Sequence, residues 1–496
     1  MLSLTVFFPL ACAVVLAALP TLPGRITRWA FIAATTIELG LTLLAWANYT
    51  APAANSFAYE EQAEWIPGVG TSYHLGVDGL SLPLIVMTAV VFLAAAIYAF
   101  KDHERPRLQA VLFLFLESVS VGLFTSLDLI LFFVFFDLSI VAMYFCIAGW
   151  GHGQPARSAL KFFLYTFLGS LALLLGFIGL YVASDPHTFD MVKLVASTPL
   201  RDHPAAAGFV LAAILLGLAI KTPTFPFHTW LPPAHTDAPA IGSLVLAAVL
   251  LKMGTYGLVR IAMPMLPDTW QAWAPGIIAV GVVSVLWGAL VALAQDNLKR
   301  MIAYTSVNHM GYIVVAVGVA GVLGDNSGQA RTVAVAGAVT QMVSHGLLTG
   351  ALFLLAGVMW TRTGSYSMSA YGGLAGASPR FTTLFAVAAF GSLGIPALSG
   401  FIAEFQIFAG TIATVPVTAV ALVGILLTAA LFLRALQNVF TGELRGLSVG
   451  FSDVKPHELV PVAGLLVLSL AIGILPRPVL DLIEPAARSV MNLVGR

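Results

Sequence analysis

Long apolar stretches alternate with short polar connections along almost the whole chain, and this pattern predicts membrane-spanning helices. A helix needs about 20 mostly apolar residues to cross a bilayer. Windows of that length predict an all-α polytopic membrane protein with about fourteen transmembrane helices. The candidate spans cover residues 2–20, 28–48, 79–100, 108–127, 129–148, 158–182, 205–230, 240–261, 274–293, 301–322, 332–359, 381–410, 415–440 and 458–476.

Two of these spans carry helix-breaking residues near their middle. The seventh contains Pro223 and Pro226, and the twelfth contains Gly394, Pro396 and Gly400. Proline removes a helical hydrogen bond, and freed backbone groups at membrane depth are tolerated only beside protein or a water-filled cavity. We therefore expect helices 7 and 12 to be discontinuous and to flank an ion or substrate site. The alternative is that these prolines only kink the helices for packing.

The two broken spans lie five helices apart, which predicts an internal repeat. Because five is odd, two successive five-helix units must face opposite ways across the membrane. Spans 4–8 and 9–13 would form these two inverted repeats. The expected organisation is therefore N-terminal helices at 1–107, a first five-helix repeat at 108–261, a second, inverted five-helix repeat at 274–440, and helix 14 with a tail at 441–496.

Several ionisable side chains fall inside or beside the predicted spans at similar depth, where a charge is costly. When a carboxylate lies next to a lysine, each charge stabilises the other. Separating the two groups therefore raises the proton affinity of the carboxylate and lowers that of the lysine. Histidine titrates close to neutral pH and can pass a proton in either direction. We therefore predict proton transfer by Glu117, Asp137, Lys221, Lys252, His309, His345 and Glu404.

Other charged positions have simpler interpretations. Glu38 has no obvious partner and is expected to be structural, and Arg434 can extend to the interface at the end of its span. His228, His235 and Asp237 have a spacing that fits no metal motif, so a loop cap or a role in proton uptake is expected. Structural ion pairing without transport remains the alternative for the charged set as a whole.

Composition and charge narrow the functional classes. Apolar residues make up 59% and charged residues 9% of the 496, with a mean hydropathy of +0.95, against about 45–50% and about 25% in soluble domains. A net charge of +0 leaves no basic face for nucleic acid. Two cysteines cannot hold an iron–sulfur cluster alone, and nucleotide-binding and HExxH motifs are absent from the sequence. We expect no cofactor and no metal on this chain, and any redox chemistry on another polypeptide.

Basic residues predict the orientation of the chain. Lys and Arg concentrate in cytoplasmic connections, and alternate connections hold most of them if both termini are external. The longest early external loop would then carry Glu60, Glu61 and Glu64. The basic residues assigned to the cytoplasmic side are Arg25, Arg28, Lys101, Arg105, Arg107, Arg157, Lys161, Lys299, Arg300, Arg362, Arg380, Arg445 and Lys455.

Four motifs, at 73–84, 220–239, 251–260 and 299–311, resemble a known family. The most specific reads Lys-Thr-Pro-Thr-Phe-Pro-Phe-His-Thr-Trp-Leu-Pro-Pro-Ala-His from Lys221 to His235. Together they resemble subunit M (chain 4) of the proton-pumping NADH:quinone oxidoreductase, the antiporter-like membrane subunit of respiratory complex I. The resemblance is strong over roughly 73–440 and weaker at the ends.

The resemblance implies two half-channels that meet on a central axis of charged residues. The family's acid on span 5 corresponds to Asp137, where the family usually carries glutamate. Aspartate is one methylene shorter, so we expect a longer or water-bridged contact with Lys221. The other family positions correspond to Lys221, Lys252, Glu404, Glu117, His309 and His345.

The expected function is proton translocation in response to quinone reduction elsewhere in a complex in the bacterial plasma membrane. FMN and iron–sulfur clusters would lie on partner subunits, and neighbouring antiporter-like and peripheral-arm subunits would be the partners. Alternatives are a subunit of a Mrp-type Na⁺/H⁺ antiporter or of a membrane-bound hydrogenase, a structural scaffold, and a stand-alone transporter. Glu404 and the Tyr256–Arg260 segment favour subunit M.

Overall fold

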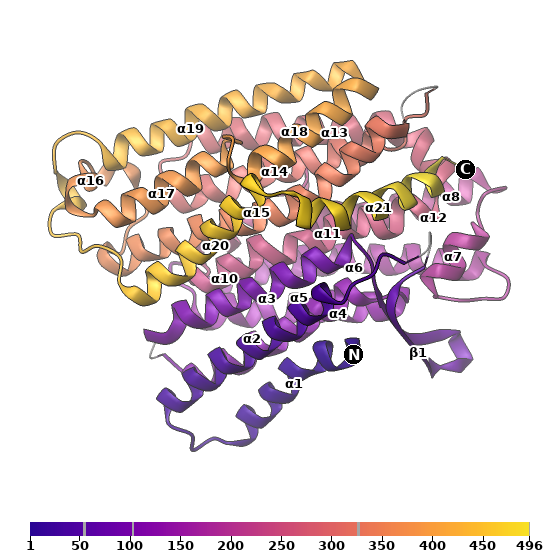
Figure 1. The fold of residues 1–496 in the computed structure, drawn as a ribbon, viewed down its shortest axis with the longest axis horizontal. Helices are drawn as coiled ribbons and strands as arrows, with labels where there is room; N and C mark the ends of the chain where they lie inside the picture. The colour runs from indigo at the N-terminus through magenta and orange to yellow at the C-terminus, as the bar shows by residue number, and fades with distance from the viewer. Residues whose placement is uncertain (53–55, 102–103, 325–327, 496) are drawn as a thin grey trace.

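Long helices packed side by side form an elongated bundle (Figure 1). The computed structural model describes residues 1–52, 56–101, 104–324 and 328–495. In these ranges, twelve helices are long and apolar enough to cross a membrane. The shorter apolar helix α1 (Leu2–Ala18) and a span broken into α17 (Pro379–Ser392) and α18 (Ser399–Thr414) complete the fourteen predicted spans. The polytopic all-α prediction is confirmed.

The first spans follow the apolar pattern closely. Pro106 and Pro155 begin two of the helices, where a missing N–H costs nothing. The Asp128 side chain caps α5 by accepting hydrogen bonds from the N–H groups of Ile130 and Leu131. The elements are α2 (Gly24–Ala47), α3 (Ser81–Tyr98) with the turn η2 (Ala99–Lys101), α4 (Pro106–Thr125), α5 (Leu129–Trp150) and α6 (Pro155–Ala183).

The seventh span is discontinuous, as predicted. The short helix α7 (Met191–Ser197) precedes α8 (Pro204–Lys221), which ends at Lys221, and α9 (Leu231–Asp237) follows after nine non-helical residues. The Trp230 indole donates a hydrogen bond to the Ile220 carbonyl at 2.9 Å, which satisfies one group freed by the break. Nearby protein thus stabilises irregular backbone inside the bundle.

The eighth span is continuous but contains two π-helical turns. It consists of α10 (Ala240–Val245), η3 (Leu246–Leu250), α11 (Leu251–Gly257), η4 (Leu258–Ala262) and α12 (Met263–Met265), so Lys252 lies between the two wider turns. Such turns are frequent at functional sites. The sequence interpretation assumed a regular helix here, because no proline marks either turn.

The second half of the chain repeats the pattern of long helices with one break. Residues 393–398 separate α17 from α18, and Gly394 has a φ of +70° there. Helices α8 and α17 start at opposite ends of the bundle (Figure 1), as expected for inverted units. The remaining elements are α13 (Pro267–Leu293), α14 (Leu298–Val319), α15 (Gly328–Thr363), η5 (Met368–Ala370), α16 (Leu374–Ala377), η6 (Pro416–Ala421), α19 (Leu422–Phe440), η7 (Gly446–Ser448), α20 (Pro456–Ile474) and α21 (Arg477–Val494).

Two elements at one end of the bundle were not predicted. Strands β1 (Ala58–Ile66) and β2 (Thr71–Val77), joined by η1 (Pro67–Val69), form an antiparallel hairpin where we expected a polar loop. The expected C-terminal tail contains α21, whose buried residues recur every three or four positions. Both are short amphipathic elements that the search for long apolar windows does not detect.

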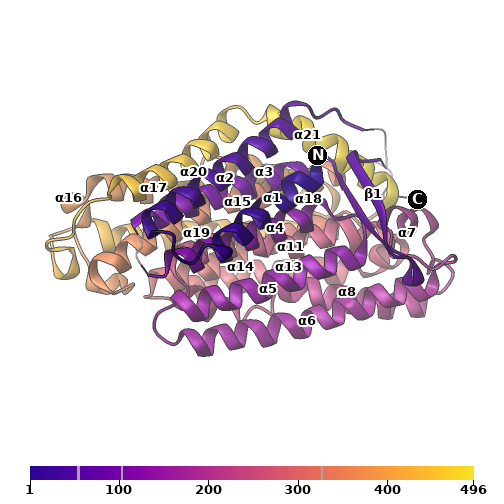
Figure 2. The ribbon, with the colours of Figure 1, turned by 90° about the horizontal axis from the view of Figure 1, so that it is seen from below.

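Both chain termini lie at the end that carries the hairpin (Figure 2). The N-terminal ammonium group of Met1 contacts the Glu61 carboxylate in β1. The Gln271 amide on α13 donates a hydrogen bond to the Val494 carbonyl at 2.6 Å. We call this end the hairpin end, and the end that carries the Lys- and Arg-rich connections the basic end.

Candidate proton-transfer site

The seven predicted proton-transfer residues come from seven different helices. Six of them are buried and Asp137 is half-buried. They lie on α4 (Glu117), α5 (Asp137), α8 (Lys221), α11 (Lys252), α14 (His309), α15 (His345) and α18 (Glu404).

Four of the seven form a continuous row across the centre of the bundle. The Lys252 Nζ atom lies 2.6 Å from the His345 Nδ1 atom. The His345 and His309 ring centroids are 5.4 Å apart in a T-shaped arrangement. The His309 Nε2 atom lies 3.8 Å from the Glu404 Oε1 atom. We call this the Lys252–Glu404 row, and it carries both an amine and a carboxylate at its ends.

The second helix break shapes the Glu404 end of the row. A Cβ atom added to Gly394 would lie 2.4 Å from the Glu404 Oε2 atom. Gly394 also has a positive φ that L residues with side chains rarely adopt. His309 Nε2 lies 3.2 Å from the Ser392 carbonyl, at the end of α17. The break therefore leaves room for the carboxylate and gives the histidine a backbone partner.

Lys221 lies at the end of α8 without a direct carboxylate contact in the part of the chain that the structure describes. Its ammonium group donates a hydrogen bond to Ser139 Oγ at 3.0 Å and lies 4.7 Å from the centre of the Phe136 ring. Asp137 is close enough for Coulombic attraction to Lys221, but its Oδ1 atom is buried without a hydrogen-bond partner. The Asp137–Lys221 contact is thus longer than a direct ion pair.

Glu117 is separate from the row. Both of its carboxylate oxygens are buried without a hydrogen-bond partner, and the same is true of Glu38 on α2. The two carboxylates are close enough for a Coulombic interaction. Among the described residues, Glu117 therefore has no direct contact with the other six predicted groups.

Two buried groups near the row were not among the predicted site residues. The His235 ring on α9 stacks on Phe353 with centroids 4.3 Å apart, and neither ring nitrogen has a hydrogen-bond partner. Lys299 is fully buried at the start of α14 and donates a hydrogen bond to the Ala238 carbonyl at 2.5 Å. His235 interacts electrostatically with both Lys299 and Lys252. The sequence did not place these residues in the site, because His235 lies in a proline-rich segment typical of a loop and Lys299 lies in a predicted connection between two spans.

The residues that could suggest a metal site have other partners. His228 Nε2 accepts a hydrogen bond from the Trp287 indole at 3.2 Å. Asp237 accepts one from Ser158 Oγ at 2.5 Å. Within the described residues, no three His, Cys, Asp or Glu side chains are grouped so as to hold a metal ion.

At the hairpin end, His74 on β2 joins the hairpin to the segment before α7. Its ring nitrogens lie 3.0 Å from Asp190 Oδ2 and 2.8 Å from Glu60 Oε1. Burial lowers the pKa of His74, but the hydrogen bonds and charges of these two carboxylates outweigh it and hold the pKa above its usual value. The same contact outweighs the burial of Asp190 and lowers the pKa of that carboxyl group.

Comparison with known proteins gives consistent results. Residues 126–430 match the family model described as NADH:quinone oxidoreductase/Mrp antiporter, TM. The chain is 38% identical over 488 residues to NAD(P)H-quinone oxidoreductase chain 4 2 of Thermosynechococcus vestitus, covering 96% of this chain and 89% of the relative. It is 36% identical over 448 residues to NADH-quinone oxidoreductase subunit M of Rickettsia prowazekii, covering 89% and 87%.

The fold is similar to that of a solved structure over its full length. A chain of respiratory complex I from Thermus thermophilus with bound NADH superposes with a TM-score of 0.89 at 28% identity. The superposition covers 100% of both chains.

Proposed function

The chain belongs to the NADH:quinone oxidoreductase/Mrp antiporter transmembrane family, and we infer that it moves protons across the membrane. It is an antiporter-like, multi-pass membrane subunit of the subunit M (chain 4) type in an NADH:quinone oxidoreductase complex. Its contribution to the enzyme is translocation. The electron-transfer groups of such a complex, FMN and iron–sulfur clusters, are proposed to lie on partner subunits.

The Lys252–Glu404 row is the observation that supports this proposal most directly. Neighbouring members of the row lie 2.6 Å (Lys252 to His345), 5.4 Å (between the two histidine ring centroids) and 3.8 Å (His309 to Glu404) apart, and all four residues are buried. Ionisable groups at membrane depth are costly, and proton relays are among the functional sites that they mark. Packing alone could use neutral side chains at a lower cost.

In the proposed mechanism, quinone reduction elsewhere in the complex changes the distance between Asp137 and Lys221. A change in this distance alters how strongly Lys221 holds its proton. Lys221 then passes the proton to Lys252, which passes it through His345 and His309 to Glu404. Thr222 and Gly254 pack tightly where α8 ends against α11, which joins the Lys221 segment to the row.

We propose that the basic end faces the cytoplasm of a bacterium and that the hairpin end with both termini faces outward. The positive-inside rule supports this orientation. His235 and Lys299 lie between the basic end and Lys252, so they are proposed to take up protons from that side. The partners would be the neighbouring antiporter-like subunits of the membrane arm and, through the assembly, the peripheral arm.

The proposal is tested by measuring proton pumping and quinone reduction together in proteoliposomes that contain the whole complex. Lys252→Ala and Lys221→Ala should each reduce the number of protons pumped per quinone reduced, while artificial electron acceptors are still reduced by NADH. Lys193→Ala, on the exposed face of α7, is the matched control and should pump normally. An unchanged pumping ratio in both test variants would contradict the proposal.

A Mrp-type Na⁺/H⁺ antiporter subunit remains the second candidate, because the family description covers both classes. Near full-length relatives named as quinone oxidoreductase subunits support the first. Sodium dependence of proton exchange in vesicles, without any NADH oxidation in the purified assembly, would favour the second.

A further inference from the structure

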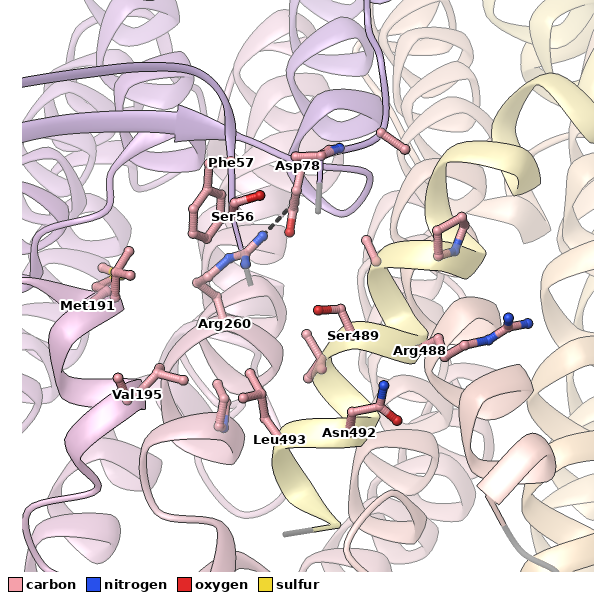
Figure 3. A pocket seen from close by; sticks show the side chains of 18 of the residues that line it. Ser56, Phe57, Asp78, Met191, Val195, Arg260, Arg488, Ser489, Asn492 and Leu493 are labelled. Atoms are coloured by element: carbon pink, nitrogen blue, oxygen red, sulfur yellow. Dashed lines mark hydrogen bonds and ion pairs between the residues drawn. The ribbon is translucent and has the colours of Figure 1, made fainter. Parts of the chain in front are cut away.

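Two separate hollows lie at the hairpin end of the bundle. The first, of about 460 Å³, lies between α7 and α21 (Figure 3). Its inner wall carries the Asp78–Arg260 ion pair, in which both residues are buried and each charge neutralises the other. The second, of about 240 Å³, lies between the segment after α7 and the start of α13. Its two charged residues, Arg201 and Asp268, are exposed, which makes it the stronger candidate for binding a ligand.

An arginine and an aspartate form an open ion pair in the second hollow. Arg201 precedes α8, Asp268 lies in the first turn of α13, and the Arg201 Nε atom is 3.1 Å from the Asp268 Oδ2 atom. The two side chains are 50% and 45% exposed. A guanidinium has five N–H donors, so it can hold a carboxylate and a phosphate at the same time. The pair therefore presents a positive and a negative group side by side to a ligand.

An apolar groove of about 720 Å³ continues from this hollow between α8 and α13. Ala272 and Trp273 line both spaces, which makes the groove and the hollow continuous. Leu216, Trp273 and Val280 line the groove and are 37%, 39% and 40% exposed, so it opens sideways on the outer surface of the spans. No charged side chain is found among the described residues that line it. At membrane depth, such a surface suits a hydrocarbon chain.

The hollow and the groove together have the depth of one membrane leaflet. Asp268 lies at the mouth, and Val280 is the last α13 residue that lines the groove, about 18 Å further along the helix. Half of a hydrocarbon core of about 30 Å is about 15 Å. At that depth, Phe225 and Pro226 from the break in the seventh span line the groove, and the Phe225 N–H group donates a hydrogen bond to Ser284 Oγ on α13 at 2.9 Å. A lipid acyl chain that starts at the ion pair therefore reaches the break.

We propose that a phosphatidylethanolamine occupies this site, with its head group on the Arg201–Asp268 pair and an acyl chain in the groove against the broken seventh span. The lipid phosphate accepts hydrogen bonds from Arg201, and the lipid ammonium group donates to Asp268. Phosphatidylglycerol has no ammonium group and brings its negative charge beside Asp268, and the phosphatidylcholine cation has no N–H donor. Lipid binding here does not depend on proton translocation, so the site goes beyond the proposed function.

The site is tested with a phosphatidylethanolamine that carries a diazirine in its acyl chain, added to the whole complex in mild detergent. After illumination, mass spectrometry identifies the labelled peptides. We expect the label to concentrate on residues 212–219 of α8 and 272–280 of α13. Label spread evenly over the exposed spans would show ordinary contact with bilayer lipid, and an unlabelled groove would show that a neighbouring subunit covers it. Either result would overturn the proposal.

Gly276→Leu fills the groove without a clash inside the chain. Gly276 lines the groove, and a Cβ atom added to it has no other atom within 4 Å. Gly40 on α2 is also an exposed helical glycine with open space around the added Cβ position, so Gly40→Leu is the matched control. We expect the groove to lose most of its label in Gly276→Leu and to keep it in Gly40→Leu. Equal labelling of the groove in the two variants would contradict the site.

Asp268→Asn tests the head-group assignment. The amide oxygen can still accept a hydrogen bond from Arg201, so the contact between the two segments is kept while the negative charge is removed. In the native chain, unlabelled phosphatidylethanolamine should compete with the probe more strongly than phosphatidylglycerol or phosphatidylcholine does. In Asp268→Asn, phosphatidylglycerol should compete at least as strongly as phosphatidylethanolamine, because the positive charge of Arg201 remains. The same preference for phosphatidylethanolamine in both chains would overturn the assignment.

Discussion

The ammonium group of Lys252 makes two short contacts, one with a backbone carbonyl and one with a histidine ring nitrogen. It donates a hydrogen bond to the Ala247 carbonyl at 2.6 Å and lies 2.6 Å from His345 Nδ1. Ala247 belongs to the π-helical turn η3, where the wider turn rearranges the backbone hydrogen bonds. One proton can therefore lie on either nitrogen of the Lys252–His345 pair, which suits a relay.

At this scale, His345→Gln is expected to separate proton pumping from electron transfer. Glutamine can accept a hydrogen bond from Lys252, but it cannot take up and release a proton near neutral pH. Pumping measured by a pH-sensitive dye in proteoliposomes should fall to the level of Lys252→Ala, with quinone reduction retained in uncoupled vesicles. His187→Gln, in the connection before α7, is the control. Full pumping by His345→Gln would remove this histidine from the route.

The His74 contacts predict a pH dependence of the hairpin. A raised pKa in the folded protein means that the stabilisation is complete below the ordinary pKa of about 6.5 and is lost as pH rises through the elevated value. The lowered pKa of Asp190 acts in the opposite direction, with stabilisation lost only on strong acidification. The protection of residues 58–77 from hydrogen exchange, taken relative to the intrinsic exchange rate at each pH, should therefore be greater at pH 6 than at pH 9. His74→Gln should remove most of this difference, and an equal difference in that variant would contradict the assignment.

At the scale of single elements, the two helix breaks serve different purposes. The break after α8 places Lys221 at a helix end, beside the Ser139 hydroxyl and the Phe136 ring. The break between α17 and α18 makes room for a carboxylate, since Gly394 contacts Glu404 with no space for a Cβ atom. In both cases the irregular backbone lies inside the protein, where freed polar groups can find partners.

Gly394→Ala should disturb the second break in two ways. A residue with a side chain at φ +70° costs about 1–2 kcal/mol, and the new methyl group must displace the Glu404 carboxylate. We expect a lower thermal transition and reduced pumping. Gly364→Ala is the matched control, because Gly364 also has a positive φ of +68° but has open space around the added Cβ position. Gly364→Ala should lower stability similarly and leave pumping unchanged. Equal pumping by both variants would show that the position of Glu404 is not critical.

At the scale of the whole molecule, the outer surface of the bundle carries large apolar side chains that lipid or other subunits can cover. Large apolar side chains are exposed on several helices, among them Phe209 at 80% and Leu426 at 71%. Lipid and neighbouring subunits can cover such surfaces, as in other membrane complexes. The hairpin and α21 lie at one end of the bundle, where both termini also meet (Figure 2).

As a subunit of a larger complex, the chain is expected to migrate with the NADH-oxidising assembly. Native membranes extracted in mild detergent and run on a native gel should show this chain in a band that oxidises NADH, identified by activity staining and mass spectrometry. Migration with other antiporter-like chains and no flavoprotein would instead support the Mrp-type alternative.

Sequence alone determined the features that depend on local composition. Stretches of about 20 apolar residues are predictable because the bilayer sets their length, and the two breaks are predictable because proline and glycine act through their own backbone. The charged residues at membrane depth could also be identified from the sequence, because charged side chains are costly and therefore rare within apolar spans. The hairpin and α21 escaped detection because short amphipathic elements carry a weak signal.

Tertiary structure decided which of these groups meet. The sequence could not show that Lys252, His345, His309 and Glu404 form one row while Glu117 lies apart, because they come from helices far apart in the chain. Nor could it show the π-helical turns around Lys252, which form in a proline-free segment, or the burial of His235 and Lys299. Contacts between distant helices depend on how side chains of all of them pack together, and one helix's sequence does not contain that information.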